Sequence, residues 1–379
     1  MKDSIFLIDS DRFGKEGHAM REDWTRQGES DGIGGGIVRF GVSGTGLDAE
    51  KFCQSNRFLR RFELAAICGE TPKAAEEFCV GKGRPLVFDD PARMASCQDL
   101  DAIYISKDVM DRQDQCILMM KEGKHVLCAS PMADTLEELE ELYRVAEDNH
   151  VILLESFPFL YTPSFQKMIP YLDSLGTIRH ATFQNCYSSV SYERWKRGIP
   201  ARDFAPETAL GGLLEAGTIP VAAMIHLFGY PKKIRGSYVT LPDSIDVTGS
   251  ILMVYEGMIG EVIYSKITDS AMPSQIQGEN GSMILREIDN IKDLSITRKS
   301  VRQAVHFEQS DNVFHHETEA FIRMTDTGKG WKKSKKLSRK TMKVLQKVRK
   351  QNEVREQKEV SEQSKLTEQK IEKPNGEEV

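Results

Sequence analysis

The sequence predicts an α/β protein with two domains: an N-terminal domain with a doubly wound parallel sheet, and a C-terminal α+β domain with a large, mainly antiparallel open sheet. Its 379 residues are enough for two domains of about 100–200 residues each. Short apolar strands alternate with helical segments up to about residue 158. After that point, alternating polar and apolar stretches follow one another directly, which is typical of an antiparallel sheet with one covered face.

Strands and helices alternate along the first domain. The clearest helix spans 135–149, where Thr135 and Glu138 are spaced as a capping box and the apolar residues share one face. Gly123 is typical of a left-handed end to the preceding helix. This order predicts a parallel sheet covered on both faces. The expected strands are 38–42, 62–68, 85–88, 100–105, 124–128 and 151–154, and the expected helices are 49–58, 73–78, 112–122 and 135–149.

The second domain is expected to contain an apolar helix, several strands and a returning helix. After Trp331 the chain is highly charged, although residues 337, 341, 344 and 348 can line one helix face, and 351–379 are typical of disorder. Residues 1–36 are polar, and their glycines precede the first strand, where no phosphate site can form. The expected helices are 219–228 and 314–324, and the expected strands are 233–241, 247–255, 259–267, 282–285 and 304–307.

We therefore divide the chain into four parts. Residues 1–36 form a flexible lead-in, 37–158 the first domain, 159–330 the substrate and dimerisation domain, and 331–379 a charged helical or disordered tail. The longest strongly apolar stretch, 219–228, is too short to span a bilayer. The N-terminus carries no secretory signal. Seven cysteines without a Cys-x-x-Cys pair predict neither a disulfide framework nor a zinc site, and favour a reducing cytoplasm.

The net charge of −6 conceals an uneven distribution. Residues 332–350 contain ten Lys or Arg and no acid, which leaves 41 basic against 57 acidic residues, or −16, elsewhere. A body this acidic is a poor binder of nucleic acid or anionic membranes. Only the segment 332–350 could bind a polyanion, and such a run is more often a solvated helix face.

A glycine-rich loop predicts dinucleotide binding. Gly44-x-Gly46-x-x-Ala49 lies between the first strand and the first helix, which is the context that this motif requires. Gly44 permits a tight turn, Gly46 lets the backbone approach a pyrophosphate, and the helix N-terminus supplies amide donors. These features predict a Rossmann domain. The alternative is a doubly wound domain whose glycines only form the turn.

The second strand suggests which dinucleotide is bound. Glu70 follows this strand, 24 residues after Gly46. A carboxylate there can accept hydrogen bonds from both ribose hydroxyls of NAD and repel the 2′-phosphate of NADP. We therefore expect NAD rather than NADP. The expected cofactor-binding residues are Gly44, Thr45, Gly46, Leu47, Glu70 and Ser106.

Several motifs follow one another along residues 38–330: Gly44-Thr45-Gly46, Asp101-Ala102-Ile103-Tyr104-Ile105, Glu122-Gly123-Lys124-His125-Val126-Leu127-Cys128, Pro131-Met132, Leu154-Glu155-Ser156-Phe157 and Gly211-Gly212-Leu213-Leu214-Glu215-Ala216-Gly217. Through these motifs the chain resembles the Gfo/Idh/MocA family of oxidoreductases, and within it the dimeric dihydrodiol dehydrogenases. The resemblance implies a Rossmann domain, a substrate domain with an antiparallel sheet, a sugar, polyol or cyclic diol as substrate, and a homo-oligomer.

The sequence differs from the family pattern at the positions of the family's catalytic residues. The family's Glu-Lys-Pro motif, with its catalytic lysine, is Ala129-Ser130-Pro131 here. The family's second motif, Asp-x-Gly-x-His or Tyr, ends here in Ile219 and so lacks the His or Tyr ring. The family's Thr-Pro loop is replaced by Ser106-Lys107-Asp108, and the histidine that follows this loop by Arg112. General acid–base help is typically worth 10²–10⁴-fold, so the family's usual route should be slow.

Other residues could replace the lost groups. Lys107 lies at the ligand-binding edge of the parallel sheet, Glu215 keeps a carboxylate, and Tyr161, with Tyr187 and Tyr192, is expected to face the cleft. The alternative for each of these residues is an ordinary structural role, as a charged loop residue or as an aromatic residue of the core or its edge. His226 is expected to be packed. His315 and Glu319 share a helix face without a further ligand pair, so no metal is expected and the helix should be solvated.

Two functions remain open. The first is an NAD(P)-binding oxidoreductase that transfers hydride between nicotinamide and a small sugar, polyol or cyclic diol. The second is a catalytically inactive relative that binds a dinucleotide as a sensor or scaffold, which the replacements Ser130 and Ile219 favour. In either case we expect a small-molecule ligand, a homo-oligomer, a cytoplasmic location and no membrane partner.

Overall fold

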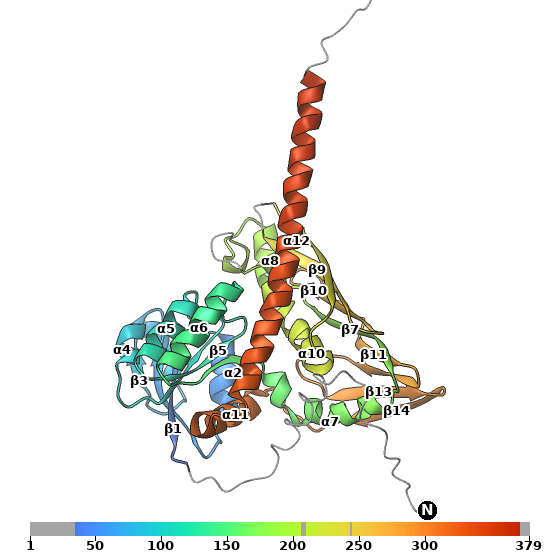
Figure 1. The fold of residues 1–379 in the computed structure, drawn as a ribbon. Helices are drawn as coiled ribbons and strands as arrows, with labels where there is room; N and C mark the ends of the chain where they lie inside the picture. Colours follow the sequence, from blue (N-terminus) through green and yellow to red (C-terminus); the bar gives the residue numbers. More distant parts are fainter. Residues whose placement is uncertain (1–34, 206–209, 243–244, 372–379) are drawn as a thin grey trace, which may run out of the picture.

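The computed structural model describes residues 35–205, 210–242 and 245–371. The expected lead-in lies, up to residue 34, outside the described residues. The first domain contains a six-stranded parallel sheet with the order β3-β2-β1-β4-β5-β6, which confirms the doubly wound fold (Figure 1). Its strands are β1 (Val38–Ser43), β2 (Phe62–Cys68), β3 (Leu86–Phe88), β4 (Ala102–Ile105), β5 (His125–Ala129) and β6 (Leu153–Ser156).

Helices cover both faces of this sheet and bury its strands. All four residues of the central strand β4 are buried, and so are all four of the edge strand β6, which α6 and α12 contact. The capping box expected at Thr135 and Glu138 is present, and Gly123 has the expected positive φ of 75°. The helices are α2 (Leu47–Asn56), α3 (Pro72–Cys79), α4 (Pro91–Ala95), α5 (Arg112–Lys121) and α6 (Leu136–Asp148).

The second domain has an eight-stranded sheet with the order β14-β13-β12-β11-β7-β10-β9-β8. Only β7 and β10 pair in parallel; the other neighbours are antiparallel. This confirms the α+β prediction. The strands are β7 (Ile178–Cys186), β8 (Lys233–Thr240), β9 (Asp246–Val254), β10 (Ile259–Ser265), β11 (Ser274–Gly278), β12 (Gly281–Leu285), β13 (Asp293–Arg298) and β14 (Val301–His306).

Helices pack on the inner face of this sheet, and α10 lies at their centre. Nine of its eleven residues are buried, because it lies between the sheet and the last helix of the chain (Figure 1). The helical elements of this part are η3 (Pro158–Tyr161), α7 (Pro163–Asp173), α8 (Val190–Lys196), η4 (Arg202–Phe204), α9 (Gly211–Glu215) and α10 (Thr218–Phe228).

Helix α11 (Phe314–Thr327) returns to the first domain and packs against α2. Phe321 is fully buried, and its ring centroid lies 6.0 Å from that of Phe40 on β1. Glu317 is also fully buried and accepts hydrogen bonds from the Ser156 hydroxyl and the Phe157 N–H, each at 2.5 Å. Glu319 is exposed and His315 is half-buried, so the expected solvated helix holds only for part of their shared face; the opposite side, with Glu317, is buried against the first domain.

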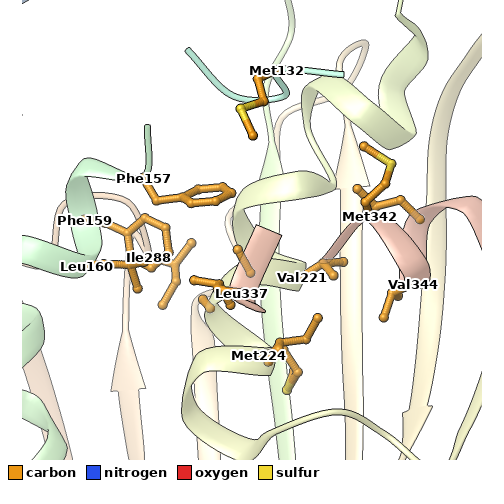
Figure 2. Close-up of a cluster of buried hydrophobic side chains, with 14 of the residues drawn as sticks. Met132, Phe157, Phe159, Leu160, Val221, Met224, Ile288, Leu337, Met342 and Val344 are labelled. Atoms are coloured by element: carbon orange, nitrogen blue, oxygen red, sulfur yellow. The ribbon is translucent and has the colours of Figure 1, made fainter. Parts of the chain in front are cut away.

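The charged segment after residue 330 is one helix, α12 (Trp331–Ile371). The structure thus shows helix up to Ile371 where the composition favoured disorder from residue 351. Leu337, Met342 and Val344 are buried beside Val221 and Met224 of α10 (Figure 2). α12 also contacts α6 and β6, so it joins both domains. The predicted apolar face of this helix is present and buried. The composition of the segment did not indicate that both domains cover this face.

Several basic residues of α12 interact within the chain. Lys335 pairs with Glu147, Arg339 with Glu140 at 2.7 Å, and Arg349 donates to the Asp134 carbonyl at 3.1 Å. Lys343, Lys347 and Lys350, with Tyr230, line a groove of about 500 Å³. Within the segment 332–350, a polyanion could bind at these lysines. Among the described residues, no helix is long and apolar enough to cross a membrane.

Candidate functional site

The glycine loop joins β1 to α2. Gly44 has φ of +102°, a conformation that side chains rarely adopt, and its N–H donates to the Cys68 carbonyl at 2.9 Å. The loop is therefore fixed to the end of β2. A side chain on Gly46 would collide with the chain, because its Cβ would lie 2.6 Å from Cγ of Asp108. The backbone conformation of Gly44 thus requires a glycine, whereas a side chain at position 46 would have to displace the Asp108 carboxylate.

The N–H groups of this loop converge on one negative oxygen. Thr45 and Gly46 donate to Oδ2 of Asp108 at 3.1 and 3.0 Å. Oδ1 of the same carboxylate accepts the Ser106 hydroxyl proton. The loop precedes the N-terminus of a ten-residue helix, which adds a partial positive charge. This is the arrangement that binds phosphate oxygens in dinucleotide-binding proteins.

The other residues expected around the cofactor lie at this edge of the sheet. Glu70 is exposed after the end of β2. Ser106 is fully buried, and its N–H donates to the Ser43 carbonyl at 3.0 Å, which places the end of β4 beside the glycine loop. Leu47, the first residue of α2, is 68% exposed. A group bound to the loop amides would therefore meet Ser106 and Leu47 directly.

The loop after β4 is held by Arg112. Its guanidinium donates to the carbonyls of Lys107 and Val109, both at 2.8 Å, and to that of Pro131 at 3.3 Å. Arg112 is 8% exposed. Lys107 is half-buried. The replacement of the family's histidine by Arg112 thus gives a loop tied to the end of β5, in which Lys107 takes part through its backbone.

Ser130 has a carboxylate partner that lies 25 residues away in the chain. Its hydroxyl donates to Oε1 of Glu155 at 2.9 Å. Glu155 is 5% exposed, and burial raises the pKa of its carboxyl, against the hydrogen bonds from Ser338 and Ser130. The sequence revealed no base next to Ser130, because Glu155 comes from the neighbouring strand and Ser338 from α12. Parallel pairing of β5 and β6, which aligns Cys128 with Glu155, creates this contact.

Glu215 belongs to a second buried cluster, at the end of α9. It forms an ion pair with Lys266 at 2.5 Å, and Lys266 is 1% exposed. The Lys266 ammonium also donates to the Asp203 carbonyl at 2.8 Å and lies 4.6 Å from the centre of the Phe204 ring. Burial, together with the charges of Glu215 and Asp203, raises the pKa of Tyr187. The sequence alone did not identify Lys266 as a site residue. Its one unusual feature there is its position at the end of an apolar strand, where a charged residue is unexpected.

The remaining candidates have environments that favour packing. The Tyr161 hydroxyl lies 3.4 Å from the Ser334 hydroxyl of α12, and burial raises its pKa. Ile219 packs against the main core, and His226 is fully buried with its ring 5.5 Å from that of Phe165. In the part of the chain that the structure describes, no group of three His, Cys, Asp or Glu residues could hold a metal ion.

A parallel sheet with a glycine loop at its carboxyl edge is typical of domains that bind dinucleotides. Residues 38–157 match the model of the oxidoreductase family GFO_IDH_MocA, described as an NAD-binding Rossmann fold. This match covers the first domain and agrees there with the resemblance that the motifs suggested.

Named relatives align with 63–83% of this chain. The chain is 28% identical to scyllo-inositol 2-dehydrogenase (NADP(+)) IolU of Bacillus subtilis (strain 168), over 83% of this chain and 97% of that protein. It is 24% identical to trans-1,2-dihydrobenzene-1,2-diol dehydrogenase of Xenopus laevis, over 63% and 71%. A 3-ketoreductase from Actinomadura kijaniata, solved with NADP and TDP-benzene, has the same fold, with a TM-score of 0.75, 20% identity and coverage of 83% and 97%.

These relatives bear on two of the alternatives that the sequence left open. Each of the three is an oxidoreductase by name, which gives no support to a non-catalytic sensor. Two of them are named or solved with NADP, whereas the carboxylate of Glu70 favours NAD. The comparisons therefore support a nicotinamide dinucleotide, and the named relatives favour NADP over the NAD that we expected.

Proposed function

We propose that this protein is an NAD(P)-dependent oxidoreductase that interconverts a secondary alcohol and a ketone on a small polyhydroxylated or cyclic molecule. The observation that carries the proposal is the convergence of the Thr45 and Gly46 N–H groups on one anionic oxygen, at 3.1 and 3.0 Å. It supports the proposal because two backbone donors that hold a carboxylate oxygen are also suited to a phosphate oxygen. The substrate class is inferred from the named activities of the inositol and diol dehydrogenases.

The dinucleotide fits the loop residues when the Asp108 carboxylate is turned away. The amides of Thr45 and Gly46 would hold the pyrophosphate, and Glu70 would accept hydrogen bonds from the ribose hydroxyls. A bound nicotinamide supplies the hydride acceptor or donor. The protein must then manage the proton of the reacting hydroxyl.

Two acid–base systems of the chain are suited to that proton. Ser130 can take the proton of a substrate hydroxyl while its own proton passes to Glu155, which lies 2.9 Å away. The raised pKa of Glu155 favours uptake of that proton. Glu215, oriented by Lys266, provides a carboxylate that can accept hydrogen bonds from further substrate hydroxyls. Lys107 and Tyr161 remain weaker candidates for either role.

The first test is direct titration with NADH and NADPH, followed by nicotinamide fluorescence. We expect binding in the wild type and none in Gly46→Arg, whose side chain would fill the phosphate position. Gly36→Arg is the matched control, because no atom lies within 4 Å of a Cβ placed at Gly36. Absence of binding of either dinucleotide, both to the wild type and to the variant Asp108→Ala described below, would refute the proposed function.

Turnover is tested on a panel of sugars, inositols and diols. If Ser130 and Glu155 move the proton, Glu155→Gln should lower kcat by about 10²–10⁴-fold while the dinucleotide affinity stays the same. Dinucleotide binding without turnover of any member of the panel would instead favour the sensor function.

Glu70 should set the preference between the two dinucleotides. We expect NADH to bind at least about tenfold more tightly than NADPH, because the carboxylate repels the 2′-phosphate. Glu70→Ala should reduce this ratio by weakening NADH binding and strengthening NADPH binding. Glu63→Ala, an exposed carboxylate on the same strand, should leave the ratio unchanged. Tighter binding of NADPH by the wild type would contradict the assignment of Glu70.

We also propose that two copies of the chain pair through the outer face of the large sheet, as the family resemblance implies. Val239 and Leu252 on its strands are 56% and 41% exposed. Next to Leu252 in the chain, Ile251 and Met253 are buried, because successive residues of a strand point to opposite faces. Apolar side chains therefore lie on a face that the described chain leaves uncovered.

A further inference from the structure

Asp108 occupies the place on the glycine loop that a phosphate group would take. Its Oδ2 atom accepts both loop amide protons, and its Oδ1 atom accepts the Ser106 hydroxyl proton. All three donors belong to residues that were expected to bind the cofactor. The carboxylate therefore uses the same hydrogen-bond donors that the cofactor needs.

The rest of the loop after β4 keeps Asp108 in this position. Ser106 continues the pairing between β4 and β1 through its N–H bond to Ser43, and Arg112 binds three carbonyls of the surrounding chain. Asp108 itself is exposed. Its side chain can thus turn into solvent without unpacking the core, while the backbone that presents it stays fixed.

A phosphate and this carboxylate cannot occupy the loop together. The Cγ atom of Asp108 lies 2.6 Å from the position of a Cβ on Gly46, so the carboxylate fills the space directly above the glycine. A pyrophosphate in that space would meet a negative charge at contact distance, which is strongly unfavourable. α2 already has Asp48 and Glu50 in its first turn, so the site gains no compensating cation from this helix.

We propose that Asp108 sets the affinity of this protein for its dinucleotide by competing with the pyrophosphate for the amides of Thr45 and Gly46. This inference rests on the proposed function. Only molecules whose Asp108 side chain has turned outward can bind, so the apparent dissociation constant is the intrinsic one divided by the fraction of such molecules. NADH and NADPH share the pyrophosphate, so Asp108 weakens both by the same factor, in contrast to Glu70.

The test compares Asp108→Ala and Asp108→Asn with the wild type in titrations with NADH and NADPH. Asp108→Ala should tighten binding of both by about 10- to 100-fold, because the charge-assisted hydrogen bonds that compete with the ligand are lost. Asp108→Asn should give a smaller gain, since its amide oxygen still accepts but has no charge. Asp114→Ala, which removes an exposed aspartate from α5, should leave both affinities unchanged.

A second measurement tests the contact without any cofactor. Hydrogen exchange of the Thr45 and Gly46 amides should be faster in Asp108→Ala than in the wild type, because both lose their acceptor. Unchanged affinities, or weaker binding in Asp108→Ala, would overturn the inference while leaving the proposed function intact. Absence of binding in both the wild type and Asp108→Ala would instead refute the proposed function itself.

Discussion

Replacing Lys266 by methionine should lower the free energy of unfolding by about 3–5 kcal/mol, since it leaves a buried carboxylate without its cation. Methionine approximates the volume of the lysine stem, so the loss is mainly electrostatic. Lys266 is 1% exposed and pairs with Glu215, whose side chain is 13% exposed. Urea denaturation at neutral pH, followed by tryptophan fluorescence, measures the change.

The double variant Lys266→Met with Glu215→Leu should recover most of this loss, because both charges are then absent. Lys232→Met is the matched control, since Lys232 forms an ion pair with Glu256 in which both side chains are mainly exposed. We expect this substitution to have little effect on the urea midpoint. A loss in Lys266→Met no larger than in the control would show that the buried pair is unimportant for stability.

Glu317 should make the protein less stable as the pH rises from about 5 to 8. Burial raises the pKa of its carboxyl to about 8, whereas an unfolded glutamate titrates near 4.3. Between these values the folded protein holds a proton that the unfolded chain has released, so a rising pH favours unfolding. The stabilisation is complete below about pH 4 and is lost through pH 8; its size is on the order of 5 kcal/mol.

Comparison with Glu317→Gln isolates this contribution, because glutamine does not titrate. Urea midpoints measured from pH 5 to 8 should fall more steeply in the wild type than in the variant. Burial also raises the pKa of Glu155 and raises that of Asp246 to about 6, but both residues are common to the two proteins. Glu319→Gln, an exposed residue on the same helix, should follow the wild type. Parallel curves for the wild type and Glu317→Gln would contradict the assignment.

The parallel sheet could be predicted from the sequence because its signals are local. Each strand is a short apolar run, and the glycine loop stands between a strand and a helix, so neighbouring residues carry the information. The strands β7, β11 and β13 were not predicted, since polar residues such as Gln184, Gln275 and Ser295 interrupt their patterns. Their place in the sheet is set by pairing with strands that are remote in sequence.

The candidate site was predicted only in part, for the same reason. The residues at the loop were identifiable because their motif is contiguous. The partners Glu155 of Ser130 and Lys266 of Glu215 come from other strands, and nothing next to Ser130 or Glu215 in the chain indicates them. The sequence indicated no role for Asp108, which belongs to the segment Ser106-Lys107-Asp108 that replaces the family's Thr-Pro loop. Its contact with Thr45 depends on β4 lying beside β1, which is a property of the sheet and not of the motif.

The position of α11 and α12 has a consequence for synthesis of the chain. Phe321 packs near Phe40, and Trp331 donates to the Leu153 carbonyl at 2.8 Å. Strands of the first domain therefore contact residues that the ribosome adds only late in translation. At about 5–20 residues per second, the ribosome takes on the order of half a minute to translate the intervening residues. During that interval the newly made first domain exposes the apolar surface that α11 and α12 cover in the complete chain.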